Sequence, residues 1–267
     1  MNIKEEYKRG NILVLGFSDS NVLKDLDDGY NTLFGVSFDS KAVQDAYNEG
    51  FYNVFDYNIT NINNLFSDGL FDTIILDRAL HKVFTLNQNQ SVSKSAITGA
   101  QKTIVMMSQV WGLLKDDGVV IIKDSMKPVT SFRYDVVSYI PTEEFEEYLT
   151  DIQEIKKVVK LGERQGDRDA LTLIDFLLFG KDYIENTIGV EYMPFDLQEI
   201  QYYLDLVGFR VIKAKSNTDK KLLDFSRGVG YYNMGHENIF PNTEYLIKLI
   251  KKWVSYQWAC SFFFFMV

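Results

Sequence analysis

NILVLG (residues 11–16) is the first of four short β-rich runs in the N-terminal part of the chain, and these runs decide the fold. The others are NTLFGVSFD (31–39), FYNVFD (51–56) and FDTIILD (71–77). Segments with helical patterns separate them, and such alternation is typical of a parallel, doubly wound sheet. In these sheets a ligand binds beyond the carboxyl ends of the strands, where the strand order reverses. The polar residues that end the runs therefore predict a ligand cleft.

The N-terminal half is expected to contain four strands and the helices between them. The run Ile74-Ile75-Leu76 is typical of a strand that is buried on both faces. Asp39 or Ser40 can cap the start of the helix after the second strand, and Gly50 can end it. The pattern predicts strands at 11–16, 32–37, 51–55 and 71–76, and helices at 20–27, 41–49, 62–66 and 91–114.

The second half is expected to complete the sheet and to add a helical cap. Gly118 opens a fifth strand, and charged helical patterns follow it. We predict one α/β domain over 1–267, with a mostly parallel, seven-stranded sheet and a helical cap inserted at 126–190. The remaining elements are expected as strands at 119–123, 209–215 and 228–234, cap helices at 142–161 and 168–179, a helix at 195–207 that Gly208 stops, and a closing helix at 243–258.

Composition narrows the class of protein. A net charge of −9 over 267 residues argues against a nucleic-acid binder that relies on phosphate neutralisation. Cys260 is the only cysteine, so the chain has no internal disulfide and no cysteine-rich metal site, and we expect no metal. The N-terminus lacks the apolar core of a secretory signal, and no apolar run approaches the roughly 20 residues that cross a bilayer. These features predict a cytoplasmic protein.

Six segments of the sequence follow one another in the same order as the motifs of one known family. They are NILVLGFSDS, GVSFDSKAVQDAYNEG, VFDYN, FDTIILDRALHKVF, VWGLLKDDGVVIIKDS and FDLQEIQYYLDLVGFRVIKAK. Together they resemble the glycine-rich loop, the ribose-binding turn, the acidic turn after strand three, strands four and five, and the Gly-Phe turn before strand six of the class I S-adenosylmethionine-dependent methyltransferases. The resemblance implies a Rossmann-like fold and S-adenosyl-L-methionine as the cofactor.

The resemblance assigns the cofactor to the ends of the first three strands. Small residues in the first loop permit close approach of the methionine part, and here Gly16 is kept while Ser18 and Ser20 replace later glycines. Ser37 stands where the family has a ribose-binding acid, and a hydroxyl is a weaker partner than a carboxylate. The implied contacts are Gly16, Phe17 and Ser18 with the methionine part, Ser37 and Phe38 with the ribose, and Asp56 and Tyr57 with the adenine.

The end of the fourth strand is where the resemblance places the reacting centre. Asp77 would lie over the sulfonium, and His81 would be a general base for an acceptor hydroxyl. Simpler interpretations exist for each: Asp77 can pair with Arg78, His81 can be a packing residue, Asp56 can be a turn former, and the first loop can be an ordinary strand-to-helix turn.

Two functions fit these residues. The first is an S-adenosylmethionine-dependent methyltransferase that acts on a small molecule, sugar or protein group, at oxygen. The second is a catalytically inactive protein of the same fold that serves as a structural, assembly or regulatory subunit, with a homo-oligomer or assembly contact through Phe262–Phe265. A phosphate-binding P-loop, a G-x-S-x-G nucleophile elbow and an H-E-x-x-H zinc motif are all missing from the sequence, which excludes those chemistries.

Overall fold

The computed structural model describes part of the chain. It describes residues 3–83, 85–87, 92–125, 136–139, 190–192, 195, 197–217, 229–232 and 244–252, and of residues 85–87, 92–97, 136–139, 190–192 and 229–232 it describes the backbone.

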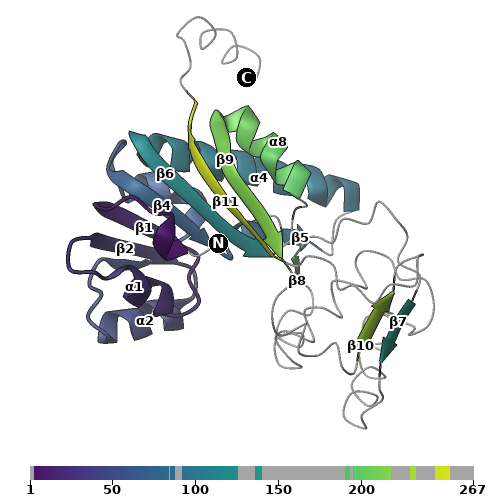
Figure 1. Cartoon of the computed structure of the whole chain (residues 1–267), viewed down its shortest axis with the longest axis horizontal. Helices are drawn as coiled ribbons and strands as arrows, with labels where there is room; N and C mark the ends of the chain where they lie inside the picture. The colour runs from purple at the N-terminus through teal and green to yellow at the C-terminus, as the bar shows by residue number, and fades with distance from the viewer. Residues whose placement is uncertain are drawn as a thin grey trace, which may run out of the picture.

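A seven-stranded sheet forms the body of the protein, in the order β3-β2-β1-β4-β6-β11-β9 (Figure 1). The first five strands in this order pair in parallel, while β11 pairs antiparallel with both of its neighbours. The predicted fold class, a mostly parallel seven-stranded α/β sheet, is therefore confirmed. The bounds are β1 (Asn11–Leu15), β2 (Thr32–Ser37), β3 (Val54–Asp56), β4 (Phe71–Asp77), β6 (Leu114–Ser125), β9 (Phe209–Asn217) and β11 (Glu244–Lys251).

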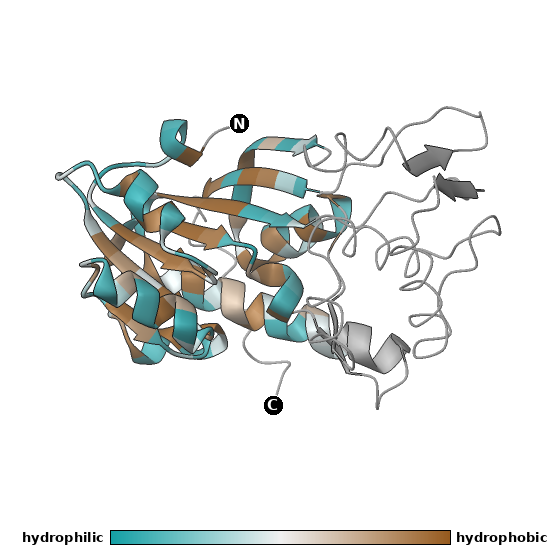
Figure 2. Cartoon of the chain, turned by 90° about the horizontal axis from the view of Figure 1, so that it is seen from below, coloured by the Kyte–Doolittle hydropathy of each residue, from teal (hydrophilic) through white to brown (hydrophobic). Residues whose placement is uncertain are grey.

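Helices cover the two faces of the sheet unequally. The larger apolar core lies between the sheet and a layer made of α4 (Val92–Leu113), α8 (Leu197–Val207) and the 3-10 helix η2 (Ile59–Asn64). On the other face, α1 (Asn21–Leu26) and α2 (Ser40–Asn48) pack on the β1–β2 side and form a second core. Figure 2 shows the apolar strands in the middle and the hydrophilic outer surfaces of the helices.

The alternation of side chains along β4 and β6 assigns each residue to one of these faces. Ile74, Leu76 and Ile122 belong to the α4 core, whereas Ile75 and Ile121 belong to the α1 core. Because successive side chains of a strand point to opposite faces, the polar residues that end these strands also divide between the two sides.

Local signals explain several boundaries that the sequence predicts. The Asp39 side chain accepts hydrogen bonds from the backbone N–H groups of Lys41 and Ala42, which makes it the N-cap of α2. Gly50 follows that helix with a φ of +99°, and Gly208 follows α8 with a φ of +103°, both left-handed conformations that suit glycine. The short elements are η1 (Ile3–Glu5) and α3 (Leu80–Val83).

The predicted closing helix at 243–258 is wrong over its described part, because residues 244–251 form strand β11 between β6 and β9. Tyr245, Ile247 and Leu249 face the α4 core, while Leu246 faces the α1 core. A strand that is buried on both faces has an apolar pattern that can also be read as a helical stripe, so spacing alone did not separate the two.

The predicted strand at 228–234 exists but lies outside the main sheet. β10 (Val229–Tyr232) pairs with β7 (Val136–Tyr139), and a second small sheet joins β5 (Thr85–Asn87) to β8 (Val190–Tyr192). The seventh strand of the main sheet is therefore β11 and not this segment.

The predicted cap helices at 142–161 and 168–179 lie outside the described residues, as does the Phe262–Phe265 segment. Among the helices that the structure describes, none has the length and apolar character needed to cross a membrane.

Candidate functional site

The carboxyl ends of the parallel strands form a continuous polar edge. Leu15 at the end of β1 pairs with Val36 of β2 on one side and with Leu76 of β4 on the other. Ser37 pairs with Asp56, and Asp77 pairs with Lys123. Gly16, Asp56 and Asp77 therefore lie along one edge of the sheet, as expected from the sequence, and β1 and β4 flank the point where the strand order reverses.

Gly16 lies in close contact with the turn after β4. Its φ is +83°, and its N–H donates a hydrogen bond of 2.9 Å to the carbonyl oxygen of Val36. A Cβ atom at this position would lie 2.6 Å from the Cβ of Ala79, which is closer than two non-bonded carbon atoms can approach. Glycine is required here by both the backbone conformation and the contact with Ala79.

The Ser37 hydroxyl forms hydrogen bonds with the backbone of neighbouring turns. The Oγ atom donates to the carbonyl oxygen of Phe17 at 2.8 Å and accepts from the N–H of Asp39 at 3.1 Å. The residue is 1% exposed. The single hydroxyl proton is thus directed at the first loop, and one lone pair of the oxygen is left for a further donor.

Two aromatic residues of the predicted cofactor set have different surroundings. Phe17 is fully buried in the α1 core, so its backbone rather than its ring borders the edge. Phe38 is 43% exposed, and the Nζ atom of Lys82 lies 4.9 Å from the centre of its ring. Burial lowers the pKa of Lys82, against the opposing effect of nearby carboxylates that include Asp39 and Asp77. Lys82 therefore places its amine over Phe38 at this edge, where the nearby carboxylates favour the charged form and burial disfavours it.

Asp56 and Tyr57 end β3 at the outer part of the edge. The exposed Asp56 carboxylate accepts a hydrogen bond from the Ser40 hydroxyl. The backbone N–H of Tyr57 donates to the carbonyl oxygen of Ser37 at 3.0 Å, which joins this turn to the end of β2. The two residues thus lie beside Ser37 at the carboxyl edge of the sheet.

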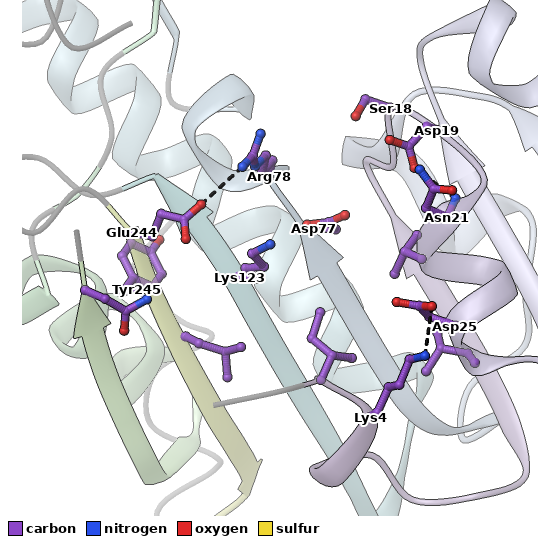
Figure 3. Close-up of a pocket in the computed structure, with 15 residues that line it drawn as sticks. Lys4, Ser18, Asp19, Asn21, Asp25, Asp77, Arg78, Lys123, Glu244 and Tyr245 are labelled. Carbon is purple, nitrogen blue, oxygen red and sulfur yellow. Dashed lines mark hydrogen bonds and ion pairs between the residues drawn. The ribbon is translucent and has the colours of Figure 1, made fainter. Parts of the chain in front are cut away.

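A cavity of about 490 Å³ opens on the α1 side of the edge. Figure 3 shows Asp77 and Lys123 between the side chains of the first loop and α1 on one side and those of β11 on the other. Two ion pairs belong to its wall, Lys4–Asp25 at 2.9 Å and Arg78–Glu244 at 3.1 Å. The lining includes Ser18, Asp19, Asn21, Asp77, Lys123 and Glu244.

Asp77 is the most distinctive charge in this cavity. Its neighbour Arg78 pairs with Glu244, and the Asp77 carboxylate has no hydrogen-bond or ion-pair partner among the residues that the structure describes. Burial raises the pKa of Asp77, although the charges of Lys123 and Arg78 act in the opposite direction. A carboxylate in this state is stabilised by a cation that enters the cavity.

The α4 side of the same edge carries a different polar group. His81, at the start of α3, is 7% exposed, and Asp124, at the end of β6, is 1% exposed. The Nδ1 atom of His81 lies 2.5 Å from an oxygen of Asp124. His81 is thus a buried residue with a carboxylate partner, and it lies on the opposite face of the sheet from Lys123.

Sequence reasoning missed three of these residues, namely Lys82, Lys123 and Asp124. The signal for the last two was the polar pair that follows the apolar run Val119–Ile122, because a strand end at the carboxyl edge is where functional groups gather. Lys82 follows His81 directly, and its position over Phe38 depends on the turn after β4, which the sequence pattern does not describe.

Comparison with known proteins establishes the fold. No protein-family model matches the sequence, and no curated protein shows significant sequence similarity to it. The structure is similar to a SAM-dependent methyltransferase of Methanosarcina mazei, with a TM-score of 0.52 and 11% identity over 94% of this chain and 96% of that one. It is also similar to a SAM-dependent methyltransferase of Archaeoglobus fulgidus, with a TM-score of 0.52 and 12% identity over 92% and 87%. The chain has the Rossmann-like fold of these proteins.

Proposed function

We propose that the protein is a methyltransferase that uses S-adenosyl-L-methionine. The observation that supports this most strongly is Asp77, a carboxylate without a partner in the described structure, which lines a cavity beside Ser18 on the edge of a methyltransferase-type sheet. S-adenosyl-L-methionine carries a sulfonium and an ammonium group, and both are cations that such a carboxylate attracts.

The cofactor would extend along the polar edge from the cavity towards β3. Its methionine part would border Gly16 and the backbone of Phe17 and would enter the cavity beside Ser18. Lys123 has no ion-pair partner among the described residues, so it is available to the methionine carboxylate. The ribose would lie over Ser37 and Phe38, and the adenine over Asp56 and Tyr57.

The acceptor is proposed to be a hydroxyl group of a small molecule, a sugar or a protein. His81 supports oxygen as the methylated atom, because an imidazole can take up the proton that a hydroxyl loses as the methyl group arrives. Asp77 would act through its charge from the α1 side of the same edge, where it lines the cavity. Methyl transfer is an in-line displacement, so positioning of the two reactants supplies most of the remaining rate.

Two observations support a second candidate, a protein of this fold that has lost catalysis and serves as an assembly or regulatory subunit. The Ser37 proton is already directed at Phe17, and the Lys82 cation lies over Phe38 where a cationic cofactor would bind. Calorimetric titration with S-adenosyl-L-methionine, together with melting curves recorded with and without it, separates the candidates. The non-catalytic subunit would give no heat of binding and no shift in melting temperature at millimolar concentration.

The substitution Ser37→Asp separates them further. A carboxylate binds the ribose hydroxyls more strongly than a hydroxyl, so an active site should bind S-adenosylhomocysteine about tenfold more tightly. The free energy of unfolding should fall by at least about 1–3 kcal/mol, because aspartate cannot donate to the Phe17 carbonyl and places a charge where Ser37 is 1% exposed. Isothermal titration calorimetry measures the first effect and urea denaturation the second.

Two variants control this experiment. Ser37→Ala loses the bond to Phe17 without adding a charge, and Ser37→Asn adds a side chain of similar size without a charge. Neither should gain affinity. A folded Ser37→Asp protein that binds S-adenosylhomocysteine no better than these two controls would argue for the blocked, non-catalytic candidate.

A further inference from the structure

Asp124 has every acceptor position of its carboxylate occupied. One oxygen accepts from the backbone N–H of Leu80 at 2.6 Å and from that of His81 at 3.3 Å. The other accepts from the backbone N–H of Ser125 at 2.7 Å and lies 2.5 Å from Nδ1 of His81. A carboxylate has about four lone-pair sites, so four donors satisfy it fully.

Tyr245 adds independent support for a saturated Asp124. It is the register partner of Asp124 on β11 and is 1% exposed, yet its hydroxyl has no hydrogen-bond partner among the residues that the structure describes. Burial, together with the charge of Asp124, raises the pKa of Tyr245 well above its usual value, so the phenol stays neutral. A neutral hydroxyl beside a carboxylate remains unpaired when other donors already fill that carboxylate.

The pattern of donors determines the proton position on His81. Three of the four donors to Asp124 are backbone N–H groups, which can only donate. The fourth position is filled by Nδ1, which must carry a proton to satisfy the carboxylate. In a neutral imidazole the other nitrogen, Nε2, then holds the lone pair.

We propose that Asp124 is a positioning residue that holds His81 as the Nδ1–H tautomer, with Nε2 as the base for the acceptor hydroxyl. This role rests on the proposed methyltransferase function. A lone pair of the acceptor oxygen would form the bond to the methyl carbon, and the electron pair of the breaking carbon–sulfur bond would return to the sulfur, which would leave as a neutral thioether. The hydroxyl proton passes to Nε2, and Asp124 stabilises the imidazolium that results.

The tautomer can be measured directly in the protein without cofactor. The chain has two histidines, so the nitrogen-15 spectrum of the imidazoles holds two sets of signals, and His236→Gln assigns them. We expect the neutral His81 ring to be protonated at Nδ1. In Asp124→Asn the amide oxygen should accept from Leu80 and His81, so the amide nitrogen faces Nδ1 and shifts the proton to Nε2. Tyr245→Phe, which leaves all four donors in place, should keep the Nδ1–H form.

Methyl transfer provides the second measurement. Asp124→Asn should lower the rate of transfer by about 100- to 10,000-fold, as expected for a misplaced base, while the affinity for S-adenosylhomocysteine changes little. An Nε2–H ring in the wild-type protein would overturn the inference, and so would a loss of less than about tenfold once the tautomer has changed. A wild-type protein with the Nδ1–H ring that binds no cofactor would instead refute the proposed function and support the tautomer assignment.

Discussion

Replacing Gly16 with alanine is expected to lower the free energy of unfolding by about 3 kcal/mol. A left-handed backbone conformation costs an alanine roughly 1–2 kcal/mol, and the φ of Gly16 is +83°. The added Cβ would also lie 2.6 Å from the Cβ of Ala79 and 3.1 Å from its Cα, atoms that move only with the backbone. Overpacking of this kind costs about 1–3 kcal/mol more.

Gly29 provides the matched control. Its φ is +76°, but a Cβ atom there would meet nothing within 4 Å. Gly29→Ala should therefore cost only the conformational part, about 1 kcal/mol. Denaturation in urea measures both variants, and Ala79→Gly should restore part of the stability of Gly16→Ala because it removes the clash. Equal losses at the two glycines would contradict the close contact between the first loop and the turn after β4.

Asp77→Asn should weaken the binding of S-adenosyl-L-methionine by about 10- to 100-fold, because a half-buried carboxylate beside a sulfonium contributes roughly that much affinity. The loss for S-adenosylhomocysteine should be smaller, since its sulfur is neutral. Asp25→Asn is a suitable control, because Asp25 lines the same cavity but already pairs with Lys4 at 2.9 Å.

The same substitution should make the protein more stable at neutral pH. Burial raises the pKa of Asp77 above the 3.8 of an ordinary aspartate, so the folded state binds a proton more tightly than the unfolded state. The stabilisation by this proton is complete below pH 3.8 and is lost as the pH rises through the pKa of the folded state. Asparagine never ionises, so the advantage of the variant should grow across that window and then stay constant.

Cofactor binding should depend on pH in the opposite sense. The affinity of the wild-type protein for S-adenosyl-L-methionine should fall as the pH decreases through the raised pKa of Asp77, since the protonated carboxyl carries no charge. Titration calorimetry over this pH range should show a flat profile for Asp77→Asn. An unchanged affinity in that variant, with Asp25→Asn equally unaffected, would contradict the role of Asp77 as the partner of the sulfonium.

Much of the fold could be predicted because local and long-range preferences agree in the N-terminal half. The strand that ends at Leu15 and the strand from Thr32 to Ser37 have apolar runs of the right length, and Asp39 has the side chain that an N-cap needs. The segment at 244–251 was mistaken for a helix because its partners, β6 and β9, lie far away in sequence. Only their pairing makes an apolar run of this length a strand.

The sequence predicts where the residues of the candidate site lie in the sheet better than it predicts which side chains they contact. The ends of the strands converge as expected, since a parallel sheet aligns them. The hydrogen bond from Ser37 to Phe17 and the pairing of His81 with Asp124 join residues 20 and 43 positions apart, and no sequence pattern encodes them. Which side chains are free to bind a ligand, and which already bind another residue, depends on such contacts between residues far apart in sequence.

A crystal structure with S-adenosylhomocysteine tests the central claim most directly, namely that the polar edge between Gly16 and Asp77 is a cofactor site. We expect density for the amino-acid part in the cavity beside Asp77 and Lys123, and for the adenine next to Asp56. Density at another surface, or an empty edge at saturating ligand concentration, would contradict the proposed function.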